Sequence, residues 1–285
     1  MTARLAVAGL GHAYALKTVL DDIDLTLDAG RVMALVGPSG CGKTTLLHLC
    51  AGLLPVQRGR LDNGFARPAV MFQQPRLLPW KTARDNIALG LKAAGMALAE
   101  RNRRSEAIAQ AVGLDELALD QFPHALSGGM QSRAALARAL VLAPDLLLMD
   151  EPFAALDIGL KGQLHRLLLD HQREHGLAVL MITHDLMEAV RLADTILVMA
   201  PEPGRIVHRF VLPTPACDRD EAHTYHTTAE LLKVPAVRES FGMEALPSAP
   251  AGLSDAAPLR LISAAADLPG GKTLKPWKAK KAFSC

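Results

Sequence analysis

The sequence GPSGCGKTT, residues 37–45, decides the fold of this chain. Two glycines, Gly37 and Gly42, bracket four residues, and Lys43 and Thr44 follow. Glycines allow the backbone to curl so that successive N–H groups surround one anion. The lysine adds a positive charge that reaches the β and γ phosphates of a nucleotide, and the threonine hydroxyl is a ligand for Mg²⁺. The stretch therefore predicts a phosphate-binding loop.

The segments on either side of this loop match the strand and helix that such a loop requires. RVMALVG (31–37) precedes it and is rich in strand-forming apolar residues. KTTLLHLCAG (43–52) follows with a helical pattern that Gly52 ends, and Pro55 lies beyond. The phosphates would then lie at a helix N-terminus, which favours anions. A glycine-rich turn with a chance lysine is the alternative, and both flanks argue against it.

Composition and charge exclude several classes of protein. The chain has 285 residues, half of them hydrophobic, and a formal net charge of +2 with its lysines and arginines spread along the sequence. This distribution argues against a nucleic-acid-binding protein, which needs a basic face. The cysteines form no C-x-x-C pair and favour a reducing compartment over a disulfide framework; they are Cys41, Cys50, Cys217 and Cys285.

No part of the sequence predicts a membrane-spanning segment. No apolar run approaches the roughly 18 residues that a spanning helix needs, and the first residues, MTARLAVAGLGHAY, lack a secretory signal. We therefore expect a soluble chain that reaches a membrane only through a partner.

Strands and helices alternate along most of the chain. Strand-like segments lie at 23–30, 31–37, 56–72 (a short pair), 145–150, 177–182 and 195–200. Most of these segments are almost entirely apolar and are separated by helices, which predicts a mainly parallel sheet covered on both faces. The stretch of about 82–140 is helical without a strand and reads as a helical insert. From Pro213 the periodicity fades and prolines recur, so we expect a C-terminal extension over 213–285 that is loose, and partly irregular or flexible.

Two acids end one of the buried strands. LLLMDEP (146–152) places Asp150 and Glu151 at its carboxyl end. Asp150 can hold Mg²⁺ through the water shell of the ion. Glu151 would point to the other side of the strand, because side chains alternate, and could accept a proton from an attacking water. A solvated turn is the alternative, which the phosphate-binding loop in the same chain disfavours.

A third motif resembles a known family. LSGGMQSR (126–133) resembles the signature loop of ABC ATPases. The other motifs of the family follow at matching places over roughly residues 5–212: Tyr14 where an aromatic residue stacks on adenine, Gln73 of the glutamine loop in MFQQPRLLPW, Asp157 ending AALD (154–157), and His184 as the switch histidine in ITHD. Met130, Ser132 and Ala154 depart from the usual pattern and affect only fine contacts.

The resemblance implies a fold, a cofactor and a set of site residues. The fold is the ABC type of P-loop NTPase: an α/β domain over 1–212 with a mainly parallel sheet, an N-terminal antiparallel β subdomain and the helical insert. The resemblance implies a role in ATP hydrolysis for Glu151, His184 and Gln73. It implies that Thr44, Gln73 and Asp150 bind Mg²⁺. ATP is implied at Tyr14, Gly37, Pro38, Ser39, Gly40, Cys41, Gly42, Lys43, Thr44, Thr45, Gln73, Asp150, Ser127, Gly128, Gly129 and Asp157.

The resemblance also implies partners. In this family two subunits face head to tail, and each ATP is held by the phosphate loop of one chain and the signature loop of the other. The second chain would be another copy or a paralogous ATPase subunit. A transmembrane permease would hold the pair at the cytoplasmic face of a bacterial inner membrane, a periplasmic or extracellular solute-binding protein would act indirectly, and no nucleic acid is involved.

Two short stretches point to a direction of transport. LLPW (77–80) and PGRIV (203–207) resemble importer ATPases for nitrate, sulfonates, taurine and thiamine-precursor pyrimidines. We therefore expect an ATPase that drives uptake of a small anionic or heterocyclic solute. The alternatives are the ATPase of an exporter or lipoprotein-extruding complex, and a soluble ABC ATPase of DNA repair or translation. The soluble class usually has two cassettes or a long coiled-coil insertion, and this sequence has neither.

Two further patterns have simpler interpretations. HQREH (171–175) has the spelling of some zinc peptidases, with His171 and His175 one helical turn apart, but it ends an amphipathic helix and suggests no third ligand. We interpret it as a solvated helix end. Cys41, inside the phosphate loop, is a small filler rather than a nucleophile.

Overall fold

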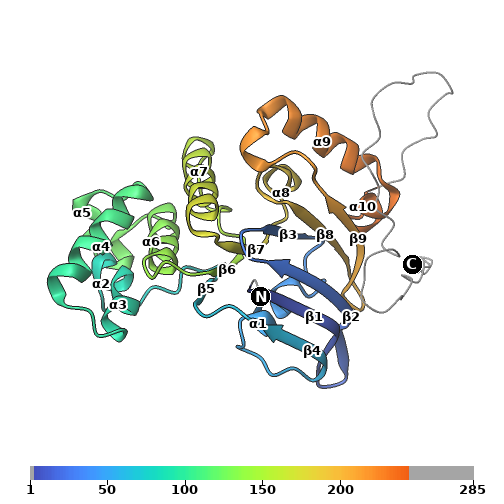
Figure 1. Ribbon diagram of the computed structural model, residues 1–285, viewed down its shortest axis with the longest axis horizontal. Coiled ribbons are helices and arrows are strands. Elements are labelled where there is room, and N and C mark those ends of the chain that lie inside the picture. The colour runs from blue at the N-terminus through green and yellow to red at the C-terminus, as the bar shows by residue number, and fades with distance from the viewer. Residues whose placement is uncertain (1–2, 244–285) are drawn as a thin grey trace.

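The computed structural model describes residues 3–243, which form two β-sheets with helices around them (Figure 1). The smaller sheet is antiparallel, with strand order β2-β1-β4. Its strands are β1 (Arg4–Tyr14), β2 (Lys17–Asp28) and β4 (Arg58–Asn63). In β2, Leu25 and Leu27 are buried and Thr26 between them is not, because successive side chains point to opposite faces. The N-terminal antiparallel β subdomain is thus confirmed.

The larger sheet has six strands in the order β5-β6-β7-β3-β8-β9. All neighbouring pairs are parallel except the last, where β9 runs antiparallel to β8. The strands are β3 (Val32–Val36), β5 (Pro68–Met71), β6 (Leu146–Asp150), β7 (Ala178–Ile182), β8 (Thr195–Ala200) and β9 (Arg205–Val211). Because β7 lies between β3 and β6, the carboxyl ends of these three strands meet at one edge.

Both faces of the larger sheet are covered, which explains its apolar strands. Along β3, Val32, Ala34 and Val36 belong to one buried cluster, and Met33 and Leu35 belong to another on the opposite face. The second face packs against α1 (Lys43–Cys50) and the smaller sheet. The first face packs against helices that include α7 (Ile158–His175) and α8 (Leu186–Leu192). The mainly parallel α/β fold expected from the sequence is confirmed.

The segment between β5 and β6 is helical, and it lies at one end of the molecule (green in Figure 1). Its helices are α2 (Ala83–Ile87), α3 (Leu89–Ala93), α4 (Leu98–Ala111), α5 (Glu116–Leu119), the 3-10 helix η1 (Pro123–Ala125) and α6 (Gly128–Leu140). Side-chain oxygens of Thr82, Asp115 and Ser127 accept a backbone N–H at the start of α2, α5 and α6, respectively. Such caps satisfy N–H groups that a helix leaves unpaired at its N-terminus.

One expectation about the strands is wrong. Residues 56–72 contain two strands, β4 and β5, but they do not pair with each other. β4 joins β1 in the smaller sheet, and β5 joins β6 in the larger sheet. A strand pattern gives the local conformation, whereas the choice of partner depends on residues distant in sequence.

The C-terminal segment also differs from the expected loose appendage. Residues 213–243 contain η2 (Ala216–Asp218), α9 (Glu221–Lys233) and α10 (Pro235–Ser240), and these two α-helices pack against α8, β8 and β9. Buried Thr224 and Thr228 donate their hydroxyl groups to carbonyls four residues earlier, at 2.9 and 2.8 Å. Because these polar side chains bond to their own helix, they can be buried, and the usual apolar period is weak. Residues 244–285 lie outside the described part, and the boundary at residue 212 stays a prediction.

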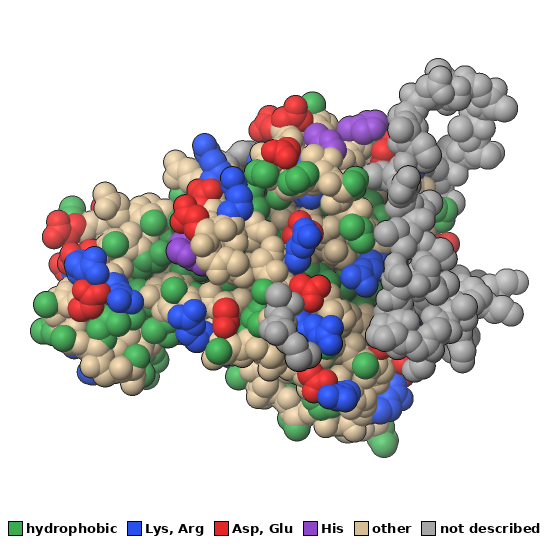
Figure 2. All heavy atoms as spheres, viewed as in Figure 1, with side chains coloured by type: hydrophobic (Ala, Val, Ile, Leu, Met, Phe, Trp, Pro, Cys, Tyr) green, Lys and Arg blue, Asp and Glu red, His purple; other side chains and the backbone are tan. Residues whose placement is uncertain are grey.

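Acidic and basic side chains alternate over the described part of the face drawn in Figure 2, without a continuous basic area. None of the helices within residues 3–243 is both long enough and apolar enough to cross a membrane.

The rings of His171 and His175 lie 5.3 Å apart at the end of α7. Over the same residues, no three His, Cys, Asp or Glu side chains are placed to hold a metal ion.

A glycine beside the phosphate loop allows a close backbone approach. A Cβ added to Gly204, before β9, would lie 2.1 Å from the Cys41 carbonyl oxygen and 2.8 Å from that of Val19. Both contacts are with backbone, so Gly204→Ala must displace the loop or the strand. We expect it to lower the free energy of unfolding by about 1–3 kcal/mol, measured by urea denaturation.

Gly162→Ala in α7 is the matched control, because an added Cβ there meets no atom within 4 Å. It should raise the free energy of unfolding by about 0.5–1 kcal/mol, as expected when alanine replaces a helical glycine. Equal effects of the two changes would contradict the steric argument.

Candidate active site

The phosphate loop joins β3 to α1 through glycines that no other residue can replace without strain. Gly37 has φ 154° and Gly42 has φ 96°, both in a region that side chains disfavour. A Cβ on Gly37 would lie 2.5 Å from the Met199 carbonyl oxygen. Gly42 precedes α1 and provides no side-chain cap. The backbone N–H groups in the first turn of α1 can therefore bind an anion.

Lys43 lies over this loop. Its ammonium donates to the carbonyl oxygens of Gly37 and Pro38, at 2.8 Å in both cases, and it is buried. Its charge is thus held where the loop curls. The thiol of Cys41 lies 3.7 Å from the ammonium nitrogen. Burial raises the pKa of Cys41, which favours the uncharged thiol and the role of a filler.

Thr44 and Asp150 meet, although they come from different elements. The Thr44 hydroxyl at the start of α1 donates to Oδ2 of Asp150 at the end of β6, at 2.8 Å. Burial raises the pKa of Asp150 and so does the nearby Glu151 carboxylate, whereas the hydrogen bond from Thr44 lowers it. A hydroxyl and a carboxylate are the hard oxygen ligands that Mg²⁺ prefers, and a cation would favour the charged carboxylate. These residues therefore fit a magnesium ion.

Glu151 occupies the centre of a second group of polar side chains. Its carboxylate accepts a hydrogen bond from Gln73 Nε2 at 3.1 Å, and its other oxygen lies 3.3 Å from His184 Nδ1. Gln73 follows β5, Glu151 follows β6, and His184 follows β7, so the order of the strands brings them together. The sequence predicts all three residues, and the structure places them side by side.

The direction of Glu151 has a different cause from the one that the sequence suggests. Strand alternation predicts that it points away from Asp150, but β6 ends at Asp150, and Glu151 has φ 47°. Its N–H donates to the carbonyl of Ile182 at 2.9 Å. A left-handed turn after the strand, rather than the strand itself, aims the carboxylate. Such a conformation is uncommon outside glycine and is often found at functional sites.

A polar pocket of about 60 Å³ adjoins Glu151, and sequence analysis missed most of its lining. It is bounded by Glu151, Ala154, Lys161, Thr183, His184, Asp185 and Glu188. Buried Glu188 lies 4.0 Å from the Lys161 ammonium and 3.6 Å from the His165 ring. The signal in the sequence is weak. Asp185 and Glu188 have the spacing of a helix capping box, which suggests a helix start rather than a pocket.

Other predicted site residues lie outside these contacts. Tyr14, at the end of β1, is half exposed and touches the edge of the His12 ring, with centroids 4.8 Å apart. Asp157 caps α7, accepting from the Leu160 N–H at 2.9 Å. Ser127 caps α6 and lies on the surface with Gly128, and an added Cβ on Gly129 would meet Leu156 and Ala155.

The loop after Gln73 is held by two polar side chains that sequence analysis did not single out. The amide of fully buried Asn86 accepts from the Leu78 N–H at 2.7 Å and donates to three carbonyls between Leu78 and Thr82. Arg138 of α6 donates to the carbonyls of Pro75 and Arg76 at 2.7 and 2.9 Å. Trp80 in this loop is 70% exposed.

Comparisons with known proteins agree with this geometry. A family model described as "ABC transporter" matches residues 20–154. The taurine import ATP-binding protein TauB of Escherichia coli O157:H7 is 43% identical over 215 residues, which cover 73% of this chain and 84% of TauB. The aliphatic sulfonates import ATP-binding protein SsuB of Mycobacterium avium (strain 104) is 45% identical over 242 residues, which cover 83% of this chain and 95% of SsuB.

Solved structures with this fold are cassettes of ABC transporters. The dimeric MJ0796, a bacterial ABC transporter cassette, superposes with a TM-score of 0.69 at 27% identity, covering 74% of this chain and 99% of that one. A post-hydrolysis dimer of the same cassette with ADP and Pi gives a TM-score of 0.68 at 26% identity.

The identities and coverages of TauB and SsuB exceed what a shared fold alone would give. They agree with the presence of residues 37–45, Asp150, Glu151 and His184 at one edge of the sheet. This chain belongs to the ABC transporter family, among the ATP-binding proteins of importers, which hydrolyse ATP to power transport.

Proposed function

We propose that this chain drives uptake of a small sulfonate through a separate permease, with Glu151 as the base of ATP hydrolysis. The proposal rests on the contacts of Glu151, which lies between Gln73 and His184 and next to the Thr44–Asp150 pair. The solute class rests on similarity to TauB and SsuB, which are named for the import of taurine and of aliphatic sulfonates. Nitrate and thiamine-precursor pyrimidines remain alternatives. The solute would pass through the permease rather than touch this chain.

In the proposed mechanism, each residue of the site has one task. The loop of residues 37–45 and the Lys43 ammonium hold the ATP phosphates, and Tyr14 stacks on the adenine ring. Thr44 and Asp150, with Gln73, would hold Mg²⁺, which would supply positive charge to offset that of the ATP phosphates. Glu151 accepts a proton from the attacking water, and His184 orients that water or the γ phosphate.

The proposed site is completed by a second chain. Ser127, Gly128 and Gly129 are the start of α6, a further helix N-terminus suited to phosphate, and the first two are exposed. One phosphate loop and one signature loop in each chain fit a symmetric pair, with Asp157 near the junction. The dimers of MJ0796 support this arrangement. The second chain is another copy or a paralogous subunit.

The loop of residues 75–81 is the proposed contact with the permease, on the cytoplasmic side of the membrane. Exposed Trp80 is a large apolar side chain, and the loop that carries it is held in shape by Asn86 and Arg138. A preorganised loop with an exposed aromatic residue favours a binding surface. Gln73, just before this loop, links the surface to the proposed magnesium site, so closure of the pair would shift the permease.

Glu151→Gln keeps the shape of the side chain and removes its basicity. We expect kcat for ATP hydrolysis to fall by about 10²–10⁴-fold, which is the usual contribution of a general base. ATP binding should be retained. Lys43→Ala is the contrasting variant: it should weaken ATP binding about tenfold to a hundredfold, because a hydrogen bond to a charged group is lost. Steady-state ATPase rates and nucleotide titrations measure both, and a wild-type rate in Glu151→Gln would remove this residue from the mechanism.

A mixed pair tests the shared site. One chain carries Lys43→Ala and the other carries Ser127→Arg. If each ATP lies between two chains, the mixed pair has one intact site and one doubly damaged site, so ATP-dependent association should return in the mixture. If each chain holds its own ATP with its own signature loop, both sites are damaged, and mixing restores nothing. Gel filtration with ATP distinguishes the two outcomes.

Trp80→Ala tests the proposed permease contact. It should leave ATP binding by the isolated chain unchanged and weaken assembly with the permease by about 2 kcal/mol or more, as for an aromatic anchor. Leu117→Ala is the control, since Leu117 is 80% exposed on α5 of the same helical segment. Unchanged assembly and uptake in Trp80→Ala would place the contact elsewhere.

A further inference from the structure

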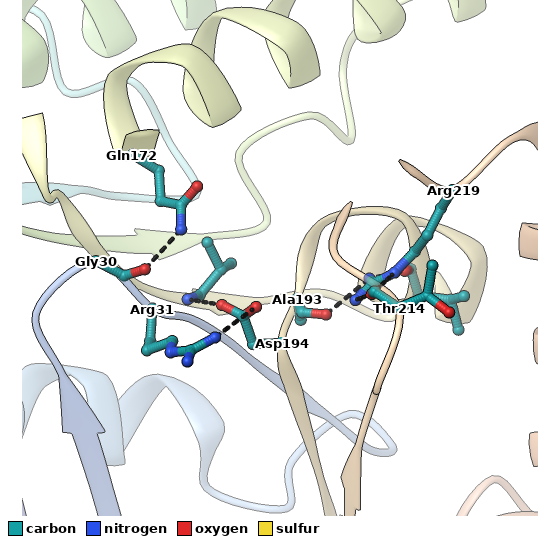
Figure 3. Close-up of polar contacts among 9 residues, drawn as sticks. Gly30, Arg31, Gln172, Ala193, Asp194, Thr214 and Arg219 are labelled. Carbon is teal, nitrogen blue, oxygen red and sulfur yellow. Dashed lines mark hydrogen bonds and ion pairs between the residues drawn. The ribbon is translucent and has the colours of Figure 1, made fainter. Parts of the chain in front are cut away.

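A buried arginine attaches the C-terminal helices to the core. Arg219 follows η2, lies just before α9, and is 8% exposed. Figure 3 shows its guanidinium reaching from this segment to the end of α8. Within the described residues, its four hydrogen bonds all go to main-chain carbonyl oxygens. Burial lowers the pKa of Arg219, and the nearby Asp194 opposes this shift.

These hydrogen bonds join two segments. Arg219 Nε and Nη2 donate to the Thr214 carbonyl at 2.8 and 2.6 Å, which closes the turn before α9. Nη1 donates to the carbonyls of Val190 and Ala193, at 2.8 Å for Ala193. Both carbonyls lie at the C-terminal end of α8, where helix carbonyls lack partners and a positive charge is favoured. Arg219 therefore caps α8 from outside the helix.

The other end of α8 lies at the active site. Asp185 directly follows His184, and its Oδ1 accepts from the N–H groups of Met187 and Glu188 at 2.9 and 3.2 Å. The helix has seven residues, so about 10 Å of rigid backbone separates its two capped ends. A displacement at the C-terminal end of α8 is thus transmitted to His184, the residue before Asp185.

The same junction also fixes the strand that leads to the phosphate loop. Asp194, directly after Ala193, accepts from the Val32 N–H at 2.8 Å and from Arg31 at 3.4 Å. Its carbonyl accepts from the Leu212 N–H at 2.9 Å. Figure 3 shows this group beside the arginine, with Gln172 of α7 bonded to Gly30. Asp194 is bonded to β3, and Arg219 binds the carbonyl of Ala193 directly before it. The bonds of Arg219 therefore set the position of α8 relative to the rest of the site.

We propose that Arg219 is a positioning residue for ATP hydrolysis: residues 213–243 brace α8 through it, and so hold His184 against Glu151. This inference rests on the proposed role of His184. A lysine cannot replace the brace fully, because one ammonium nitrogen does not span the carbonyls that the guanidinium fork joins. None of the four hydrogen bonds of Arg219 goes to β3 or to the phosphate loop, so the brace acts on kcat rather than on nucleotide affinity.

The test compares Arg219→Met and Arg219→Lys in the full-length chain. In Arg219→Met, kcat should fall between about tenfold and about a hundredfold, the range expected when a catalytic group is misplaced by up to about 1 Å. The KM for ATP and the dissociation constant for nucleotide should stay near their wild-type values. Arg219→Lys should give an intermediate kcat.

Arg191→Met is the matched control. Arg191 of α8 is half-buried and forms an ion pair with exposed Glu221 of α9 at 3.9 Å, so the change removes a link between the same helices without touching the carbonyls. Its kcat should remain near the wild-type value. Rates are expressed per ATP-binding site, and thermal unfolding is recorded for each variant, which separates lost protein from lost catalysis.

His184→Ala alone and combined with Arg219→Met completes the test. If Arg219 acts through His184, the double variant should be no slower than His184→Ala, because the two effects are not additive. A wild-type kcat in His184→Ala would overturn the proposed role of that histidine and the brace with it. A slow His184→Ala with a wild-type kcat per site in Arg219→Met would overturn the brace alone. If Arg219→Met does not fold, Arg219→Lys decides by the same comparisons.

Discussion

The hydrogen bond between Thr44 and Asp150 depends on the order of the parallel strands, and this strand order organises the whole molecule. The two residues are 106 positions apart in sequence, yet their oxygens lie 2.8 Å apart. They meet because β6, β7 and β3 run parallel as neighbours, so their carboxyl ends share one edge. The loop of residues 37–45 follows β3, the two acids end or follow β6, and His184 follows β7. A different strand order would separate them without changing any local structure.

Covered faces make this edge rigid enough for catalysis. The alternate side chains of the larger sheet enter two separate clusters, so the sheet is held from both sides. Close packing in such interiors resists small displacements. On this support the chain holds an uncommon backbone conformation, the φ of 47° at Glu151. Strain of this kind persists only where the surrounding structure over-determines it.

Polar side chains that bind backbone carbonyls connect the site to the rest of the chain. Asn86 and Arg138 shape the loop after Gln73, and Arg219 caps α8 behind His184. Each of these side chains bonds to main-chain atoms outside its own helix or turn. For Asn86 these atoms belong to the loop just before its helix, and for Arg138 and Arg219 they include carbonyls of a segment distant in sequence. Such bonds are strong when buried, because a lost partner leaves an unsatisfied group. They connect the helical segment and the C-terminal helices to backbone close to Gln73 and to the helix that follows His184.

Sequence alone was enough to identify the family, most strands of the larger sheet, and the residues that meet at its edge, but not β9. Glycine spacing, apolar strands and acids at a strand end are local features, and local physics is enough to interpret them. The tertiary structure alone decided that β4 and β5 join different sheets, that a turn aims Glu151, and that α9 and α10 are ordered. It alone revealed the carbonyl contacts of Arg219 and Asn86 and the place of Glu188 in the pocket beside Glu151. These outcomes depend on contacts between distant segments and on buried polar groups that bond to backbone carbonyls. Because every residue has a backbone carbonyl, the sequence does not show which carbonyl a side chain will bind.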